Sequence, residues 1–224
     1  NILKTQLRAM IYAHREYGNL EVMIPMVSRL EEVQVVKRIL NEALQEIIEE
    51  TGTKIPAPRF GIMIEVPSVT FILEELSAEC DFFSIGSNDL LSYFFAADRN
   101  NPKVSKSFDP FAPAAVRYLK KLYVKVESLE KTISVCGELA GSPVGCLMLM
   151  SLGYTLFSMN YSQIAKVKYI INNVSRQELL ALGEKALTIS SSASIKNLYL
   201  EYARSCGIAA IVDSKQSQEL EMRS

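Results

Sequence analysis

The arrangement of apolar residues along this chain constrains its fold more than any other feature. Short apolar runs, rich in β-branched and aromatic residues, alternate with longer amphipathic stretches. We predict a strand in each short run, at residues 20–27, 60–66, 81–86, 132–138 and 154–160. Because these runs are almost continuously apolar, we expect strands that are buried on both faces, which is typical of parallel sheets.

Helices are predicted between these strands. They cover residues 29–51, 68–79, 111–129 and 144–152, with more helices between residues 162 and 206. Pro67, Pro113 and Pro143 stand where three of the helices would begin, a position that tolerates proline. Strands that alternate with helices, without hairpins, indicate a parallel sheet with right-handed crossovers. A doubly wound sheet and a (β/α)8 barrel both have this pattern, although no strand is followed by the GxGxxG of a dinucleotide fold.

Composition narrows the class of protein. The 224 residues carry a formal net charge of −1, without the basic excess of a nucleic-acid binder. No apolar run approaches the ~20 residues of a membrane span, and the first residues lack the apolar centre of a signal peptide. We expect a globular domain over residues 1–209 and a polar tail over 210–224. Segment 90–107, which is long and polar, is predicted to be a functional loop.

The cysteines and the histidine give weaker signals. Four cysteines without a CxxC pair favour a reducing cytoplasm over a zinc or disulfide framework. Cys80, Cys146 and Cys206 are predicted to be buried structural residues. The single histidine, His14, lies beside two charged residues, and we expect it on the surface rather than in a catalytic site.

Chemically capable side chains follow the predicted strands at one end. Glu65 ends the second strand, Asn88 and Asp89 follow the third, and Cys136 and Glu138 end the fourth. Ligands bind at the carboxyl ends of parallel strands, so these positions predict a site. Two carboxylates would suit Mg²⁺, although each could instead cap a helix or form a surface ion pair.

Two further residues are candidates with ordinary alternatives. The Cys136 thiol could act as a nucleophile or a general acid, or be a buried structural group. Arg99, in segment 90–107, could hold a phosphate through its planar guanidinium, or simply be solvated.

Five ordered motifs resemble the phosphoenolpyruvate-binding domain of enzyme I of the bacterial phosphotransferase system. They are GIMIEVP at 61–67, DFFSIGSNDL at 81–90, ADRN at 97–100, CGELAG at 136–141 and FSM at 157–159. Leu139-Ala140 points to enzyme I rather than to pyruvate phosphate dikinase, and residues 98–101 and 158–160 are more similar to the nitrogen-regulatory branch than to the sugar branch.

The resemblance implies a (β/α)8 barrel, of which this chain supplies about the last five βα units. It implies that Glu65 and Asp89 hold Mg²⁺, and that Asn88, with the adjacent backbone and Arg99, holds the phosphate. Cys136 would protonate the enolate carbon as pyruvate forms, with Glu138 nearby.

The resemblance also implies partners outside this chain. The phosphoryl group would pass to a histidine on a separate N-terminal domain and then to the histidine phosphocarrier protein, so the isolated chain would not complete the transfer. Two copies would pair as a homodimer. The chain departs from the family pattern at Leu91, where threonine is usual, and at Ser142-Pro143, where an acidic residue is usual.

Two other functions remain open. A magnesium-dependent lyase or aldolase of the citrate-lyase-like barrels would also use Glu65 and Asp89, but not Cys136. A module that only dimerises or senses a ligand would need no catalytic residue.

Overall fold

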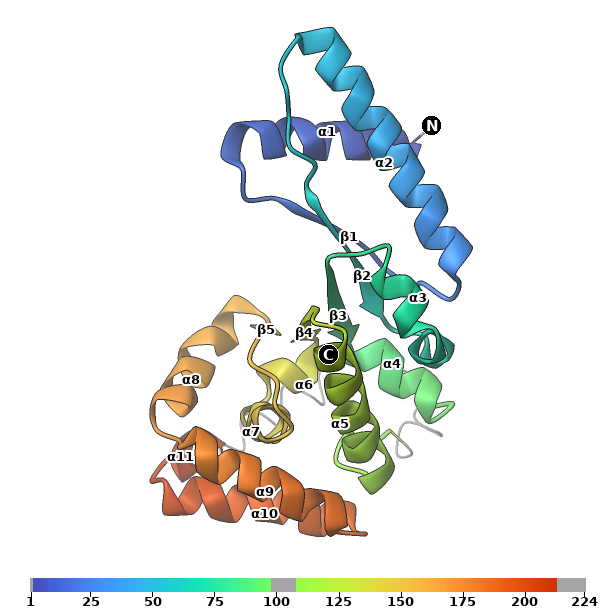
Figure 1. The fold of residues 1–224 in the computed structure, drawn as a ribbon. Coiled ribbons are helices and arrows are strands. Elements are labelled where there is room, and N and C mark those ends of the chain that lie inside the picture. Colours follow the sequence, from blue (N-terminus) through green and yellow to red (C-terminus); the bar gives the residue numbers. More distant parts are fainter. Residues whose placement is uncertain (1, 98–107, 213–224) are drawn as a thin grey trace. The chain divides into compact units, whose positions relative to one another are not determined.

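A computed structural model describes residues 2–97 and 108–212 (Figure 1). Five strands form a parallel sheet in the order β1-β2-β3-β4-β5. The predicted α/β class and the five predicted strands are therefore confirmed. A doubly wound sheet reverses its strand order at a switch point, whereas here the order follows the sequence, as it does in a barrel.

The chain divides into two compact units. The first comprises Asn1–Ser84 and Val126–Thr132, and the second comprises Ile85–Lys125 and Ile133–Ser224. None of the helices in the described ranges combines the length and the apolar character that a membrane crossing requires.

The first unit contains two long helices and the beginning of the sheet. Its elements are α1 (Ile2–Tyr17), β1 (Glu21–Ile24), α2 (Leu30–Thr51), β2 (Arg59–Ile64), the 3-10 helix η1 (Pro67–Phe71), α3 (Leu73–Ser77) and most of β3 (Phe82–Gly86). Helices α1 and α2 lie side by side (Figure 1). Arg8 of α1 donates to Glu46 and Glu50 of α2, at 3.1 and 2.6 Å. Such exposed pairs guide the packing of two helices more than they stabilise it.

Both ends of α2 follow from its sequence. The Glu32 carboxylate accepts hydrogen bonds from the backbone N–H groups of Ser28 and Arg29, at 2.8 and 3.1 Å. These bonds, the Ser28 amide first, lower the pKa of Glu32. At the other end, Gly52 has a left-handed backbone (φ 62°) and donates to Ile48 O, as helix-ending glycines do.

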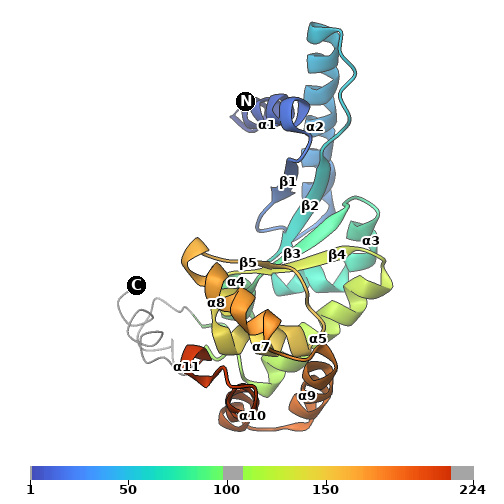
Figure 2. The same cartoon turned by 90° about the vertical axis from the view of Figure 1, so that its left-hand side faces the viewer.

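The second unit is mostly helical. Its elements are α4 (Ser87–Phe94), most of α5 (Pro113–Ser128), most of β4 (Thr132–Cys136), α6 (Glu138–Gly141), α7 (Pro143–Ser151), β5 (Phe157–Ser158), α8 (Tyr161–Asn172), α9 (Arg176–Thr188), α10 (Ser192–Ser205) and α11 (Ala209–Val212). Helix α7 is almost entirely buried and contacts α9 and α10 (Figure 2). The buried hydroxyls of Ser151 and Tyr199 join α7 to α10 at 2.7 Å.

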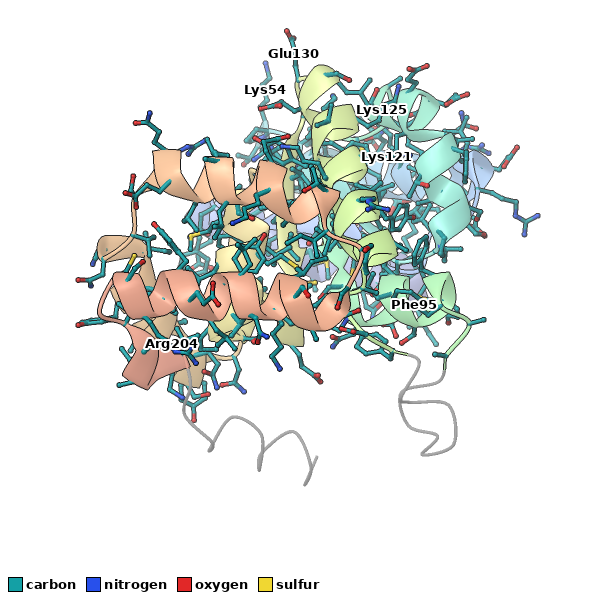
Figure 3. All side chains as sticks on the ribbon, turned by 90° about the horizontal axis from the view of Figure 1, so that it is seen from below. Lys54, Phe95, Lys121, Lys125, Glu130 and Arg204 are labelled. Carbon is teal, nitrogen blue, oxygen red and sulfur yellow. The ribbon has the colours of Figure 1, made fainter. Side chains whose placement is uncertain are left out.

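Helices α4 and α5 are joined by aromatic contacts. Phe94 stacks on Tyr118 with ring centroids 4.5 Å apart. Figure 3 shows the side chains around them, with Phe95 directly after α4 and Lys121 and Lys125 about one turn apart on α5. Pro67, Pro113 and Pro143 each begin a helix, as predicted. The departure at Ser142-Pro143 has a structural role, because the Ser142 hydroxyl caps α7 by accepting from Gly145 N.

The prediction that the strands are buried on both faces holds only for the central ones. Strands β2 and β3 are buried along nearly their whole length, whereas β1 and β4 alternate and β5 is partly exposed. Strands β1 and β5 are the edges of the sheet, where each has a neighbour on one side only.

Two predicted segments have a different local structure. The helix predicted at 68–79 is divided into η1 and α3 at Ile72, whose backbone (φ −123°) is not helical. The loop predicted at 90–107 begins later, because α4 extends to Phe94 with Leu90 and Leu91 buried. Residues 98–107 lie outside the described part of the chain.

The prediction that His14 lies on the surface is wrong. His14 is 8% exposed, and it shares the buried face of α1 with Leu7 and Ile11. Cys80 and Cys146 are buried as predicted, whereas Cys206 is only half-buried because it follows the end of α10.

Candidate functional site

In the first unit, Glu65 follows β2 and is 6% exposed. Its Oε2 accepts the backbone N–H of Met26 at 2.9 Å. Met26 has a positive φ of 55°, a conformation that costs a non-glycine residue about 1–3 kcal/mol. The chain after β1 thus adopts a strained turn in which an amide donor meets a buried carboxylate, a combination that is concentrated at functional sites.

In the second unit, the end of β3 leads directly into α4. Gly86 is the N-cap of α4 and gives it no side-chain cap. The first N–H groups of a helix have no partner within the helix, and together with the helix dipole they favour an anion. Asn88 and Asp89 are half-buried in this first turn. The segment that follows the third strand is thus a helix N-terminus, where the Asp89 carboxylate also favours the helix.

The end of β4 is tied to this helix start by two hydrogen bonds. The Cys136 thiol donates to Ile85 O, with 3.3 Å between sulfur and oxygen. The Ser87 hydroxyl donates to Cys136 O at 2.7 Å. A carbonyl acceptor stabilises the S–H form over the thiolate, so this environment suits a proton donor.

Gly137 allows the close approach between these segments. Its backbone φ is 100°, in a region that residues with a side chain rarely adopt. A Cβ at Gly137 would lie 2.7 Å from Ser87 Oγ and 3.2 Å from Asn88 Oδ1. Cys136 and Asn88, predicted to share a site, are therefore brought together in the second unit.

The other predicted residues have separate positions. Glu138 is exposed at the start of α6. Glu65 belongs to the first unit and Asp89 to the second. Arg99 lies outside the described residues. Asn160, at the end of the fifth predicted strand, caps α8 by accepting from Ser162 N at 3.0 Å.

The sequence reasoning missed Met26 and Ser87. Ser87 belongs to the motif DFFSIGSNDL at 81–90. The signal for its role was a hydroxyl side chain between Gly86 and Asn88 at the end of a strand. For Met26, which lies inside the first predicted strand, the only signal was its place directly after Pro25.

The donor chemistry of these residues fits Mg²⁺. Within residues 2–97 and 108–212, no three or more His, Cys, Asp or Glu side chains gather as they would in a protein cage for a metal. Mg²⁺ does not require such a cage, because it keeps several waters and takes one or two carboxylates together with oxygens of the substrate. Glu65 and Asp89 are carboxylates of this kind.

This chain is similar to known proteins over most of its length. A family model described as "PEP-utilising enzyme, PEP-binding domain" matches residues 1–176. The phosphoenolpyruvate-protein phosphotransferase of Mycoplasma genitalium is 40% identical over 198 residues, which cover 88% of this chain and 33% of that protein. The enzyme of the same name from Bacillus subtilis is 35% identical, and the match covers 87% of this chain and 34% of that protein.

A Salmonella typhimurium protein described as "Phosphoenolpyruvate-dependent phosphotransferase system" is 35% identical over 94% of this chain and 28% of its own length. The chain thus spans about a third of the length of these relatives. Among solved structures, a citrate lyase from Burkholderia xenovorans matches with a TM-score of 0.55, covering 94% of this chain and 71% of that one.

At 16% identity the citrate lyase shows the fold alone, and its barrel-type fold is consistent with a partial (β/α)8 barrel here. The family match covers well over half of the chain and contains β1 to β5 and the residues described above, from Met26 to Glu138. The chain therefore belongs to the PEP-utilising enzymes that share this PEP-binding domain.

Proposed function

We propose that this chain is the phosphoenolpyruvate-binding part of a phosphoenolpyruvate–protein phosphotransferase. One observation supports this most strongly: the Cys136 thiol donates to Ile85 O, and the adjacent Gly137 lies against Asn88 at the uncapped N-terminus of α4. A helix start can bind the phosphate of phosphoenolpyruvate, and a proton donor can protonate the enolate that remains after the phosphoryl group has left.

The residues have distinct roles in this proposal. Asn88 and the first amides of α4 bind the phosphate, with Arg99 as a second contact and Glu138 near the carboxylate end of the substrate. Glu65 and Asp89 hold Mg²⁺, which neutralises charge on the phosphate when it is bound. Once the phosphoryl group has left, the Cys136 S–H proton passes to the methylene carbon of the enolate, giving pyruvate. Water then returns a proton to the thiolate.

The names of the relatives support transfer of the phosphoryl group to a protein. We propose that the acceptor is a histidine on another part of the full-length protein, and that the phosphoryl group passes from there to a histidine phosphocarrier protein. His14 is not that acceptor, because it is buried on α1. We propose that the full-length protein works in the cytoplasm as a homodimer, and that this chain alone does not complete the transfer.

Exchange of pyruvate protons with solvent tests the role of Cys136. With Mg²⁺ and pyruvate in D₂O, we expect the chain to catalyse deuterium incorporation into the methyl group, followed by NMR. Cys136→Ala should lower this rate about 100-fold, as the loss of a general acid does, whereas Cys206→Ala should not change it. Equal exchange by the Cys136→Ala variant would reject the proposal and would favour a lyase that makes no use of this thiol.

A further inference from the structure

We propose that Ser87 is a positioning residue for Cys136. Its hydroxyl holds the backbone of Cys136 so that the thiol stays protonated and hydrogen-bonded until it donates to the substrate. This inference rests on the proposed function of Cys136 and extends it to a residue that does not itself contact the substrate.

The first support is the burial and the geometry of Ser87. Its side chain is 1% exposed at the first position of α4, so it cannot exchange its hydrogen bond for water without a local opening. The 2.7 Å bond to Cys136 O has the usual length of a well-formed O–H···O hydrogen bond. The partly buried Cys136 carbonyl would lose this hydrogen bond without the hydroxyl, and the loss of a partner destabilises such an acceptor.

The second support is that the two hydrogen bonds run in opposite directions between the same segments. Ser87 donates to the Cys136 carbonyl, and the Cys136 thiol donates to the carbonyl of Ile85, two residues before Ser87. The first bond fixes the peptide plane between Cys136 and Gly137, and thereby the direction of the Cα–Cβ bond that carries the sulfur. With the sulfur placed in this way, the thiol can donate its hydrogen bond to the carbonyl of Ile85.

The third support is Gly137, which admits no side chain at this point. A Cβ added to Gly137 would lie only 2.7 Å from Ser87 Oγ. The Ser87 hydroxyl therefore packs against Gly137. The same hydroxyl donates its hydrogen bond to the carbonyl of the preceding residue, Cys136.

The consequence is chemical as well as structural. A thiol that donates to a carbonyl is stabilised as S–H, which is the form that gives its proton to an enolate carbon. Without the Ser87 hydroxyl, the Cys136 side chain is released from Ile85 O and the thiolate becomes easier to form. A residue with a purely structural role would change stability but not the reactivity of this thiol.

Alkylation of Cys136 by iodoacetamide, measured at pH 7 by peptide mass spectrometry on the intact chain, provides the test. The reagent reacts with the thiolate, so we expect Ser87→Ala to raise the rate about threefold, the lower end of what the loss of one hydrogen bond gives. Ser151→Ala is the matched control, because Ser151 is equally buried in the same unit but bonds to Met148 O and Tyr199. Its alkylation rate at Cys136 should equal that of the wild type.

A second pair of variants separates the hydroxyl from the shape of the side chain. Ser87→Thr keeps the hydroxyl and Ser87→Val has the same shape without it, so only Ser87→Val should show the faster alkylation. This pair also decides the matter if Ser87→Ala does not fold. Equal rates for the Thr and Val variants, or a wild-type rate for a folded Ser87→Ala, would overturn the proposal.

Failure of the proposed function would give a different result. If the wild type catalysed no deuterium exchange into pyruvate, the catalytic role of Cys136 would be rejected while the alkylation rates still reported on Ser87. If exchange occurred and alkylation did not respond to Ser87, only the positioning role would be rejected. If both held, Ser87→Val should lower exchange and Ser87→Thr should largely restore it.

Discussion

Single residues determine how the candidate site is built, and two of them have unusual backbones. Met26 and Gly137 both have a positive φ, and each lies at a hydrogen bond or a close contact of a predicted site residue. In each case the conformation turns the chain directly after or near a strand, so that a polar group reaches a neighbouring segment. Such strain persists only where the surrounding structure supports it.

Replacement of Gly137 tests this at the residue scale. We expect Gly137→Ala to cost about 2–4 kcal/mol in the free energy of unfolding, because the new methyl adds a clash with Ser87 Oγ to the unfavourable backbone. Gly52→Ala is the control, since Gly52 also has a positive φ but has open space around it, and it should cost only about 1 kcal/mol. Urea unfolding of both variants measures the difference, and equal costs would contradict the close contact.

The buried thiols predict a dependence of stability on pH. Burial raises the pKa of Cys146 to about 12, from a value near 9. Between these two values the unfolded chain loses a proton that the folded chain keeps, so stability is fully present below about pH 9 and falls as pH rises toward 12, by about 1.4 kcal/mol per unit for one thiol.

Cys146→Ala should therefore flatten the decline in unfolding free energy between pH 9 and 10.5, when each protein is referred to its own value at pH 8. The measurement is urea unfolding as a function of pH. If the slope of unfolding free energy against pH were unchanged, the Cys146 thiol would have the same pKa in the folded and the unfolded chain, which would contradict the prediction.

At the scale of elements, the residues at the helix starts determine where each helix begins. Helix α2 begins where Glu32 reaches back to the amides of Ser28 and Arg29, and α7 begins at a serine cap followed by proline. These local bonds decide where a helix starts and hence where the preceding strand must end. They use short-range chemistry, which a sequence displays directly.

Loss of the α2 cap gives a prediction at this scale. Glu32→Ala should lower the unfolding free energy by about 1 kcal/mol, as the loss of a capping side chain does. Glu31→Ala, on the exposed neighbour in the same turn, should cost only a few tenths of a kcal/mol, since it removes a charge near the helix dipole but no cap. Because the folded pKa of Glu32 is lowered, its contribution is present above its ordinary pKa and is lost as pH falls through the lowered value. A cost for Glu32→Ala that equals that of Glu31→Ala would contradict the cap.

Much of the fold was predictable at this scale, and the errors have identifiable causes. The five strands were recognisable from their β-branched and aromatic runs, and the nearness of Asn88 to Cys136 followed from the rule that parallel strand ends share one edge. The extent of α4 was missed because Gly-Ser-Asn-Asp resembles a turn, although here it is a helix start. His14 was misplaced because its charged neighbours were weighed above its helical spacing from Leu7 and Ile11.

The bonds of the site itself were beyond the sequence. That Ser87 meets Cys136 O depends on the backbone of Gly137, and that Met26 meets Glu65 depends on a positive φ at a residue that seldom adopts one. These contacts join segments far apart in the chain, and no local pattern encodes them.

At the scale of the whole molecule, the family match covers residues 1–176, whereas α9 to α11 lie almost wholly beyond it. These last helices contact α7, which is nearly all buried and directly follows α6. Of the two carboxylates that we propose as Mg²⁺ ligands, Glu65 belongs to the first unit and Asp89 to the second. The central claim is the proposal that binding of phosphoenolpyruvate depends on Mg²⁺ and on both of these carboxylates.

Titration calorimetry of phosphoenolpyruvate into this chain, with and without Mg²⁺, tests that claim most directly. We predict binding that needs Mg²⁺ and that weakens at least about tenfold in Glu65→Gln and in Asp89→Asn, one variant in each unit. Glu31→Gln, which changes an exposed carboxylate of α2, should bind like the wild type. Binding that is equally strong in EDTA, or that survives in both carboxylate variants, would contradict the account.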